Sequence, residues 1–263
     1  MKEYINVGIA LCVILLICIF CFLSKSNNKT KAKYELNSSI GVTTANCPYC
    51  NVELKKFPGR KTKCKNCGNF IYVRTRPADN KKILIKEEEK ISIEGEWAKR
   101  NGVYDIFLER KNEFESVKQE LIKKRNTTNI TDNDVNWVLY QNKRLNAANL
   151  NQWADYGFYT EQMADILYDE KKYLPALAHY IETEYFRICC GGNADGFMSK
   201  TYIKKLNKSP MVLSCFIDCM EKLNITTKDV KKIFMDLTII NAPFPLEREE
   251  AWKYIKKGIE YWE

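Results

Sequence analysis

Four cysteines have both the residue type and the spacing to bind a metal ion. They form two CxxC pairs separated by thirteen residues, and they are Cys47, Cys50, Cys64 and Cys67. Four thiolates at this spacing are typical of a structural zinc ribbon, in which tetrahedral coordination leaves no open position for a substrate. Iron suits the same four-thiolate geometry and is the alternative metal. We therefore predict a structural Zn²⁺ site over residues 46–77.

The residues around the two CxxC pairs support a ribbon. Gly68 directly follows the second pair and Asn51 follows the first, and these two residue types tolerate the positive φ of a zinc knuckle. The segment Phe70–Val73 favours a β-strand, which we expect to pair with Val52–Leu54. Three aromatic residues either cover the metal or, together with the basic residues of the ribbon, stack on single-stranded nucleic acid; they are Phe57, Phe70 and Tyr72.

The other candidate groups indicate no reaction. His179 is the only histidine, and the sequence contains no P-loop, GxGxxG or HExxH motif. Four further cysteines are expected to be small buried apolar side chains rather than a second metal site; they are Cys189, Cys190, Cys215 and Cys219. We therefore predict a protein that is not an enzyme.

The N-terminal segment Ile5–Leu23 is uncharged and strongly apolar. As a helix it is roughly 28 Å long, which is sufficient for one bilayer crossing. A secretory signal peptide is the competing interpretation, but the apolar run is longer than usual and no small-residue cleavage pattern follows it. Residues 1–24 are therefore predicted to be a transmembrane anchor.

Charge predicts the orientation of this anchor. Four lysines follow the apolar segment within a short distance, whereas Lys2 before it is balanced by Glu3. Positive residues stay on the cytoplasmic side, and zinc-binding thiolates belong in a reducing compartment. We expect a single-pass protein of the cell membrane whose soluble part is cytoplasmic.

The basic residues are concentrated between the anchor and residue 86. From Lys25 to Lys86 there are fifteen Lys and Arg against three Asp and Glu, whereas the rest of the chain from Glu87 has 26 against 29. Residues 25–45 read as a flexible basic tether. This charge attracts anionic lipid head groups or nucleic acid, or it only sets the membrane topology.

Residues 87–263 are predicted to be α-helical, because glycines are few and apolar residues recur every three or four positions. Asp132 or Asn133 is expected to cap one helix and Thr226 or Thr227 another, and Pro245 suits the first turn of the last helix. One helical hairpin, turning at residues 169–171, is similar to a tetratricopeptide repeat (TPR), with no second copy at the expected period. The residues that match are Ala164, Leu167, Tyr173, Ala176 and Tyr180. The fold class is mainly α.

Several runs of this sequence resemble zinc-ribbon plus helical-repeat proteins that are carried by prophages and other mobile elements of Gram-positive bacteria. The runs are CPYCNVELKKFPGRKTKCKNCGNFIYVRTRP, NDVNWVLYQNKRL, MADILYDEKKYLPALAHYIETEYF and EEAWKYIKK. The resemblance implies the four ribbon cysteines as metal ligands and a helical interaction domain, without an established activity. Some members add a SAP-type DNA-binding segment, and this sequence has none.

Together these features predict a non-enzymatic, membrane-tethered zinc-ribbon protein that acts as an adaptor. In this interpretation the helical domain binds a protein partner close to the membrane. The alternative is a nucleic-acid-binding protein that uses the basic ribbon and tether, with Lys61, Lys63 and Lys65 as the expected phosphate contacts.

Overall fold

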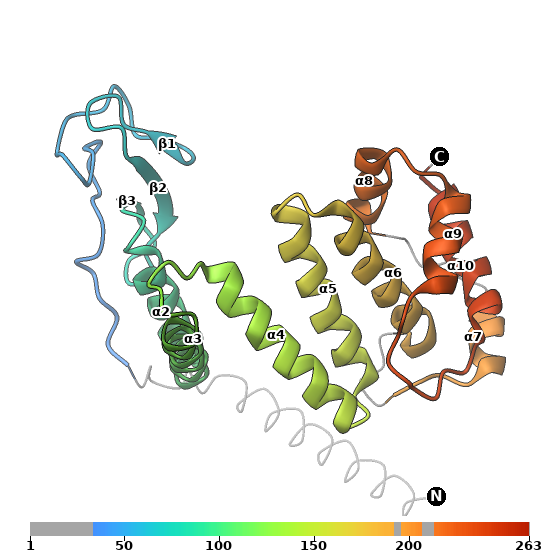
Figure 1. Ribbon diagram of the computed structural model, residues 1–263. Helices are drawn as coiled ribbons and strands as arrows, with labels where there is room; N and C mark the ends of the chain where they lie inside the picture. The colour runs from blue at the N-terminus through green and yellow to red at the C-terminus, as the bar shows by residue number, and fades with distance from the viewer. Residues whose placement is uncertain (1–33, 192–195, 207–212, 263) are drawn as a thin grey trace, which may run out of the picture. The chain divides into compact units, whose positions relative to one another are not determined.

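The computed structural model describes residues 34–191, 196–206 and 213–262, which form a mainly helical protein with a small three-stranded sheet (Figure 1). The predicted anchor over residues 1–24 and the first part of the predicted tether lie outside the described residues. Within the described ranges, no helix is both long and apolar enough to cross a bilayer. The chain divides into two compact units, one up to Asn112 and one from Glu113 onward.

The first unit contains the antiparallel sheet. Its order is β1–β2–β3, with β1 at Thr62–Lys63, β2 at Phe70–Thr75 and β3 at Lys82–Ile85. The predicted pairing of β2 with residues 52–54 is wrong, because β2 pairs with β1 and β3. Glu53 instead forms a bridge with Asn46, and the Leu54 N–H donates to the Ala45 carbonyl. The backbone of residues 52–54 therefore closes the first knuckle locally and is not available to β2.

The two faces of this sheet pack against different groups. Ile71 and Leu84 are fully buried among the ribbon cysteines. Tyr72 and Ile85, which are paired across β2 and β3, pack on the other side with Ile93 of α2 (Lys90–Arg100). This division follows from the strand period of two, which sends neighbouring side chains to opposite faces.

The last part of the predicted tether is folded onto the first unit. Val42 and Leu84 exchange two backbone hydrogen bonds of 2.9 and 2.8 Å. Gly41 has φ +74°, and a Cβ atom there would lie 2.8 Å from Ile83 Cδ1. Only glycine allows the chain to pass this close to β3. Residues 34–45 are therefore part of the fold rather than a free linker.

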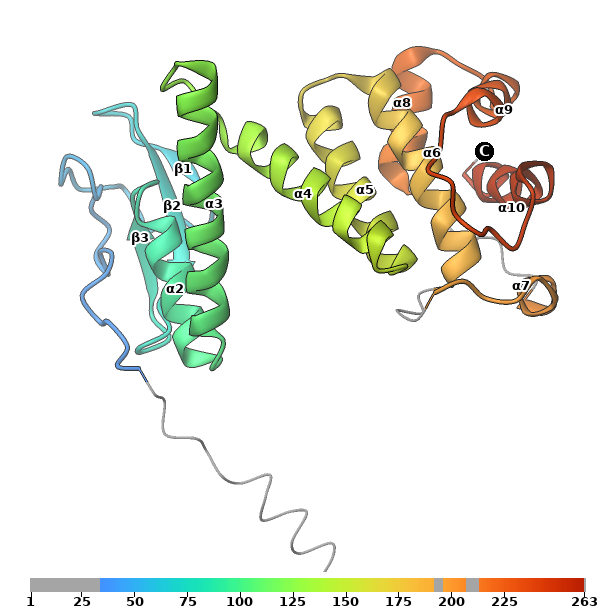
Figure 2. The same ribbon diagram turned by 60° about the horizontal axis from the view of Figure 1, so that its bottom comes forward.

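The second unit is helical, and its boundary with the first unit lies within α3 (Tyr104–Arg125). Three long helices lie side by side in chain order, as Figures 1 and 2 show. They are α4 (Asp132–Asn149), α5 (Trp153–Asp169) and α6 (Tyr173–Cys190). The predicted hairpin between α5 and α6 is confirmed, with Lys171 in the left-handed region and the Lys172 N–H donating to the Leu167 carbonyl.

Helix α6 lies at the centre of the main core. Ala176, Leu177, Tyr180 and Ile181 are fully buried there, with Phe216 and other side chains of the following helices around them. These helices are α7 (Lys200–Leu206), α8 (Ser214–Leu223), α9 (Thr227–Asp236) and α10 (Arg248–Glu260). The seam predicted for a TPR hairpin is thus a core seam, and the TPR assignment itself stays a prediction.

Helix boundaries differ from the sequence prediction in two places. Thr131, rather than Asp132 or Asn133, caps α4 through a capping box with Asp134. The last helix begins at Arg248 after the cap position Glu247, so Pro245 precedes it and is not in its first turn. Thr226 caps α9, as one of the two predicted alternatives. Thr131 is the better cap of α4 because two hydrogen bonds form there. Its hydroxyl accepts the Asp134 N–H, and the Asp134 side chain accepts the Thr131 N–H.

Candidate metal centre

Two knuckles with the same backbone geometry hold the ribbon cysteines. In the first, the Asn51 N–H donates to the Cys47 carbonyl at 2.8 Å, and in the second the Gly68 N–H donates to the Cys64 carbonyl at 2.9 Å. Asn51 has φ +58° and Gly68 has φ +74°, as their residue types predicted. Each turn folds its CxxC pair back on itself, so that both thiols of a pair point to one side.

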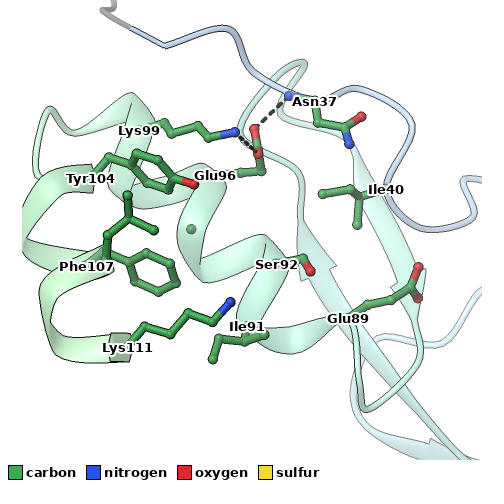
Figure 3. Close-up of a pocket in the computed structure, with 12 residues that line it drawn as sticks. Asn37, Ile40, Glu89, Ile91, Ser92, Glu96, Lys99, Tyr104, Phe107 and Lys111 are labelled. Atoms are coloured by element: carbon green, nitrogen blue, oxygen red, sulfur yellow. Dashed lines mark hydrogen bonds and ion pairs between the residues drawn. The ribbon is translucent and has the colours of Figure 1, made fainter. Parts of the chain in front are cut away.

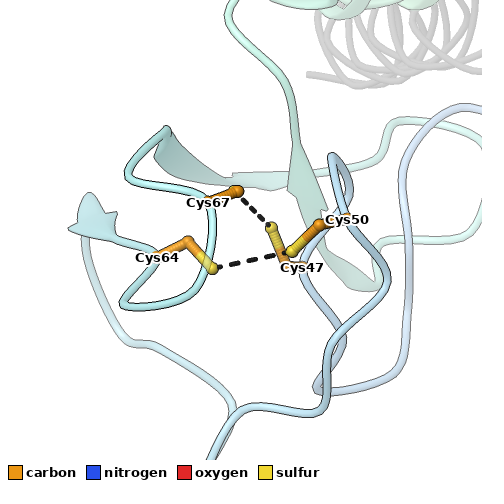
Figure 4. Close-up of side chains that lie close together, drawn as sticks. All are labelled: Cys47, Cys50, Cys64 and Cys67. Carbon is orange, nitrogen blue, oxygen red and sulfur yellow. Dashed lines mark hydrogen bonds between the residues drawn. The ribbon is translucent and has the colours of Figure 1, made fainter.

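All four predicted ligands converge. The four Sγ atoms lie within 4.8 Å of one another (Figure 4). The Cys47–Cys67 Sγ distance is 3.7 Å and the Cys50–Cys64 distance is 3.8 Å. A tetrahedral zinc ion with Zn–S bonds of about 2.3 Å requires sulfur atoms roughly 3.8 Å apart. The residues therefore fit a four-thiolate metal, and the donor set suits zinc or iron.

Local hydrogen bonds and burial act differently on the four thiols. Burial raises the pKa of Cys47 to about 12. A hydrogen bond from the Asn66 side chain, 3.4 Å from Cys50 Sγ, lowers the pKa of Cys50 to about 6. The pKa of Cys64 is also lowered, mainly by the backbone N–H of Cys67. These donors stabilise thiolates, which are the form that binds a metal.

The aromatic residues of the ribbon divide between the two predicted roles. Phe57 packs against the core that contains the cysteines, as expected of a side chain that covers the metal. Phe70 does not, and 46% of its surface is exposed. Tyr72 is buried on the opposite side of the sheet from the thiols. Of these three aromatic residues, Phe57 alone covers the predicted metal site. The strand period places Ile71 and Val73 on the thiol side of β2, and therefore Phe70 and Tyr72 on the other side.

The remaining cysteines do not form a second cluster among the described residues, where the ribbon thiols are the one cysteine group close enough to hold a metal. Cys189 and Cys190 are neighbours in sequence but point into two different apolar cores. Burial raises the pKa of both thiols to about 12. Cys219 is buried and Cys215 is partly buried in the first of these cores. The positions of these side chains agree with the expected role as apolar core residues.

His179 belongs to a polar cluster that the sequence did not reveal. Glu182 is buried, and its Oε1 accepts a 2.8 Å hydrogen bond from the Tyr156 hydroxyl. Its Oε2 lies 3.5 Å from His179 Nδ1 and 3.7 Å from Arg144 Nη1. The cluster joins α4, α5 and α6. Acidic residues usually lie on the surface, so nothing in the local pattern signals the burial of this one.

A pocket of about 330 Å³ lies in the first unit between the segment before Ile40, α2 and the start of α3 (Figure 3). Its most buried polar group is Glu96, which accepts hydrogen bonds of 2.7 Å from the Asn37 N–H and from Lys99 Nζ. Tyr104 and Phe107 form one wall with stacked rings. Both Glu96 oxygens are therefore paired within the protein, and the bond from the Asn37 N–H links the backbone before Ile40 to α2.

Comparison with known proteins found no matching family model, no matching curated protein and no matching solved structure.

Proposed function

We propose that this protein is a zinc-stabilised binding protein without catalytic activity of its own. The observation that carries the proposal is the closed set of four thiols at tetrahedral spacing. A metal held by four protein ligands has no position left for water or substrate, so it supports a fold rather than a reaction. In this proposal the metal stabilises the ribbon fold, and surfaces of the two units bind the partner.

The helical unit offers a surface suited to a protein partner. An apolar groove with about 580 Å³ of open space runs between the start of α6 and α9. Its apolar walls come from Leu174, Pro175, Ala178, Ile233 and Leu237. Leu174 is 53% exposed although it belongs to the helix at the centre of the core. Grooves of this kind bind the apolar face of a partner helix, and they support the adaptor role predicted from the sequence.

The cellular setting of this adaptor rests on the N-terminal sequence. The apolar segment Ile5–Leu23 and the lysines after it would hold both units at the cytoplasmic face of the membrane. The TPR-like character of the α5–α6 hairpin is part of the same proposal, because repeats of that class serve protein binding.

Affinity purification of the full-length protein from its host tests the adaptor role. We compare wild type with Leu174→Asp, which places a charge in the groove, and with Leu150→Asp as a matched control. Leu150 is 58% exposed at the end of α4, outside the groove. The adaptor role predicts at least one co-purifying protein that Leu174→Asp loses and Leu150→Asp retains. Identical sets of co-purifying proteins for all three forms would contradict it.

A further inference from the structure

The sheet of the first unit presents an exposed aromatic ring on the face opposite the metal ligands. Phe70 is the first residue of β2 and stands opposite Lys63 of β1. Ile71, the next residue, points into the cysteine core, so Phe70 points away from it. An exposed phenylalanine in a strand this short contributes nothing to the core, which leaves its ring available to another molecule.

Lysines surround this ring at close range. Lys61 Nζ lies 4.4 Å from the centre of the Phe70 ring and 4.9 Å from that of Tyr72. Lys63 Nζ lies 5.9 Å from the centre of the Phe70 ring. Distances below about 6 Å allow cation–π attraction, so these contacts hold the ammonium groups beside the ring. We call Phe70, Lys61 and Lys63 the Phe70 face.

The charge of this face is not neutralised by neighbouring acids. Lys61 and Lys63 are exposed, and neither forms an ion pair with any residue in the part of the chain that the structure describes. Glu87 interacts electrostatically with Lys61, but its ion pair is with Lys90, at 2.7 Å. The face therefore keeps its positive charge for a polyanion.

We infer that the Phe70 face binds single-stranded nucleic acid, with an unpaired base stacked on Phe70 and neighbouring phosphates bound by Lys61 and Lys63. Stacking platforms flanked by cations are the general means of binding single strands without reading their sequence. A lipid surface fits less well, because Gly68 and Asn69, which directly precede Phe70 in the chain, are exposed and have no apolar side chain to insert into it. The Phe70 face shares no residue with the α6–α9 groove, so the nucleic-acid inference and the adaptor role are tested by separate experiments.

Fluorescence polarisation with a labelled oligothymidylate of about 16 nucleotides tests the inference on purified full-length, zinc-loaded protein. Each phosphate contact to a single strand adds about 0.7 to the slope of log K against log salt. The double variant Lys61→Gln, Lys63→Gln should therefore bind more weakly and lose about 1.4 from this slope. Phe70→Ala should weaken binding about tenfold and leave the slope unchanged, because stacking involves no ion release.

The matched control is the double variant Lys253→Gln, Lys257→Gln, which makes the same charge change on α10. It should bind the oligonucleotide as wild type does. An equal loss of oligonucleotide affinity in both double variants would show that binding depends on net charge alone, and it would overturn the inference. Absence of binding at low salt would also overturn it. A duplex that binds as tightly as the single strand would exclude stacking on Phe70.

Vesicles separate nucleic acid from lipid. The binding of wild type to phosphatidylserine vesicles and to phosphatidylcholine vesicles is measured, and the same is done for the double variant Lys61→Gln, Lys63→Gln. The inference predicts that the two forms prefer phosphatidylserine to the same extent. A preference that disappears in the variant, without oligonucleotide binding by wild type, would assign the face to anionic lipid and overturn the inference.

Discussion

The two units of this protein are held together in different ways. Among the residues that the structure describes, the core beside the ribbon thiols contains two fully buried aliphatic side chains, Ile71 and Leu84. In the helical unit, α6 is buried over most of its length and lies against side chains from α5, α8, α9 and α10. We expect a core as small as that of the ribbon to depend on a bound metal for stability, whereas the helical core is stabilised by apolar packing.

The two units should therefore respond differently to the loss of a single side chain. Four side chains define the ribbon site, and we expect the loss of any one of them to remove a ligand that a tetrahedral metal site requires. The helical unit spreads its stabilisation over many contacts, so that a single loss is graded rather than complete.

Removal of a metal ligand should have the largest effect. Cys64→Ser is expected to abolish zinc binding and unfold the ribbon, because structural zinc contributes about 10–16 kcal/mol of apparent binding free energy in small domains. Metal analysis should find a single zinc ion per wild-type chain and none in the variant. Amide hydrogen exchange should show lost protection in β2 and unchanged protection in α5 and α6.

Cys215→Ser is the matched control, because Cys215 is a partly buried cysteine of α8 outside the thiol cluster. It should retain the zinc ion and the protection of β2. Loss of protection in both units of Cys64→Ser would show that the helical core also depends on the metal, and would contradict the contrast.

Truncation in the helical core should give a smaller, graded effect. Phe216 is fully buried against α6, and Phe216→Ala is expected to lower the free energy of unfolding of the helical unit by about 3–5 kcal/mol. Urea unfolding followed by circular dichroism measures this loss, and zinc content should stay the same. Phe158→Ala, at a 53% exposed position of α5, should change stability by no more than about 1 kcal/mol.

A buried carboxylate adds a pH dependence to the helical unit alone. Glu184 is fully buried; its Oε1 accepts a 2.7 Å bond from Arg187, and its Oε2 has no hydrogen-bond partner among the described residues. Burial raises the pKa of Glu184 from 4.5 to about 7. A raised carboxyl pKa means that the charged form is disfavoured in the folded state. The stability that the neutral carboxyl contributes is therefore complete below about pH 4.5 and is lost as the pH rises through 7.

Glu184→Gln keeps the shape of the side chain without its charge. Relative to wild type, this variant should become more stable as the pH rises from about 5 to about 8, with a total change on the order of 3 kcal/mol. Urea unfolding at the two pH values gives the difference. A constant offset between the two proteins would show that Glu184 does not titrate in this range.

The extent to which the sequence predicted each unit follows from the same contrast. The ligands and both knuckles were predictable, because metal chemistry fixes residue type and spacing within a short segment. The partner of β2 was not, since pairing with β3 depends on a hairpin around Asn80 that no spacing rule specifies. In the helical unit, apolar periodicity predicted α5 and α6. The burial of Glu182 and Glu184 depends on helices distant in sequence and left no local signal.

The smallest expected effect concerns the cap of α4, where local sequence alone determines structure. The Thr131 hydroxyl accepts the Asp134 N–H at 3.1 Å, and Asp134 Oδ2 accepts the Thr131 N–H at 2.9 Å. Thr131→Ala should cost about 1 kcal/mol at neutral pH, the usual value of an N-cap. Thr128→Ala, three residues earlier in the preceding loop, removes a hydroxyl outside the capping box and should be neutral.

The cap should also weaken in acid. Hydrogen bonds from Thr131, followed by the contact with Arg125, lower the pKa of Asp134 from 3.8 to about 2. The stability that the charged carboxylate contributes is thus present above pH 3.8 and is lost as the pH falls towards 2. The difference between Thr131→Ala and wild type, measured by thermal unfolding, should shrink over this interval. A difference that stays constant would mean that the hydroxyl acts on the backbone alone, without the aspartate half of the capping box.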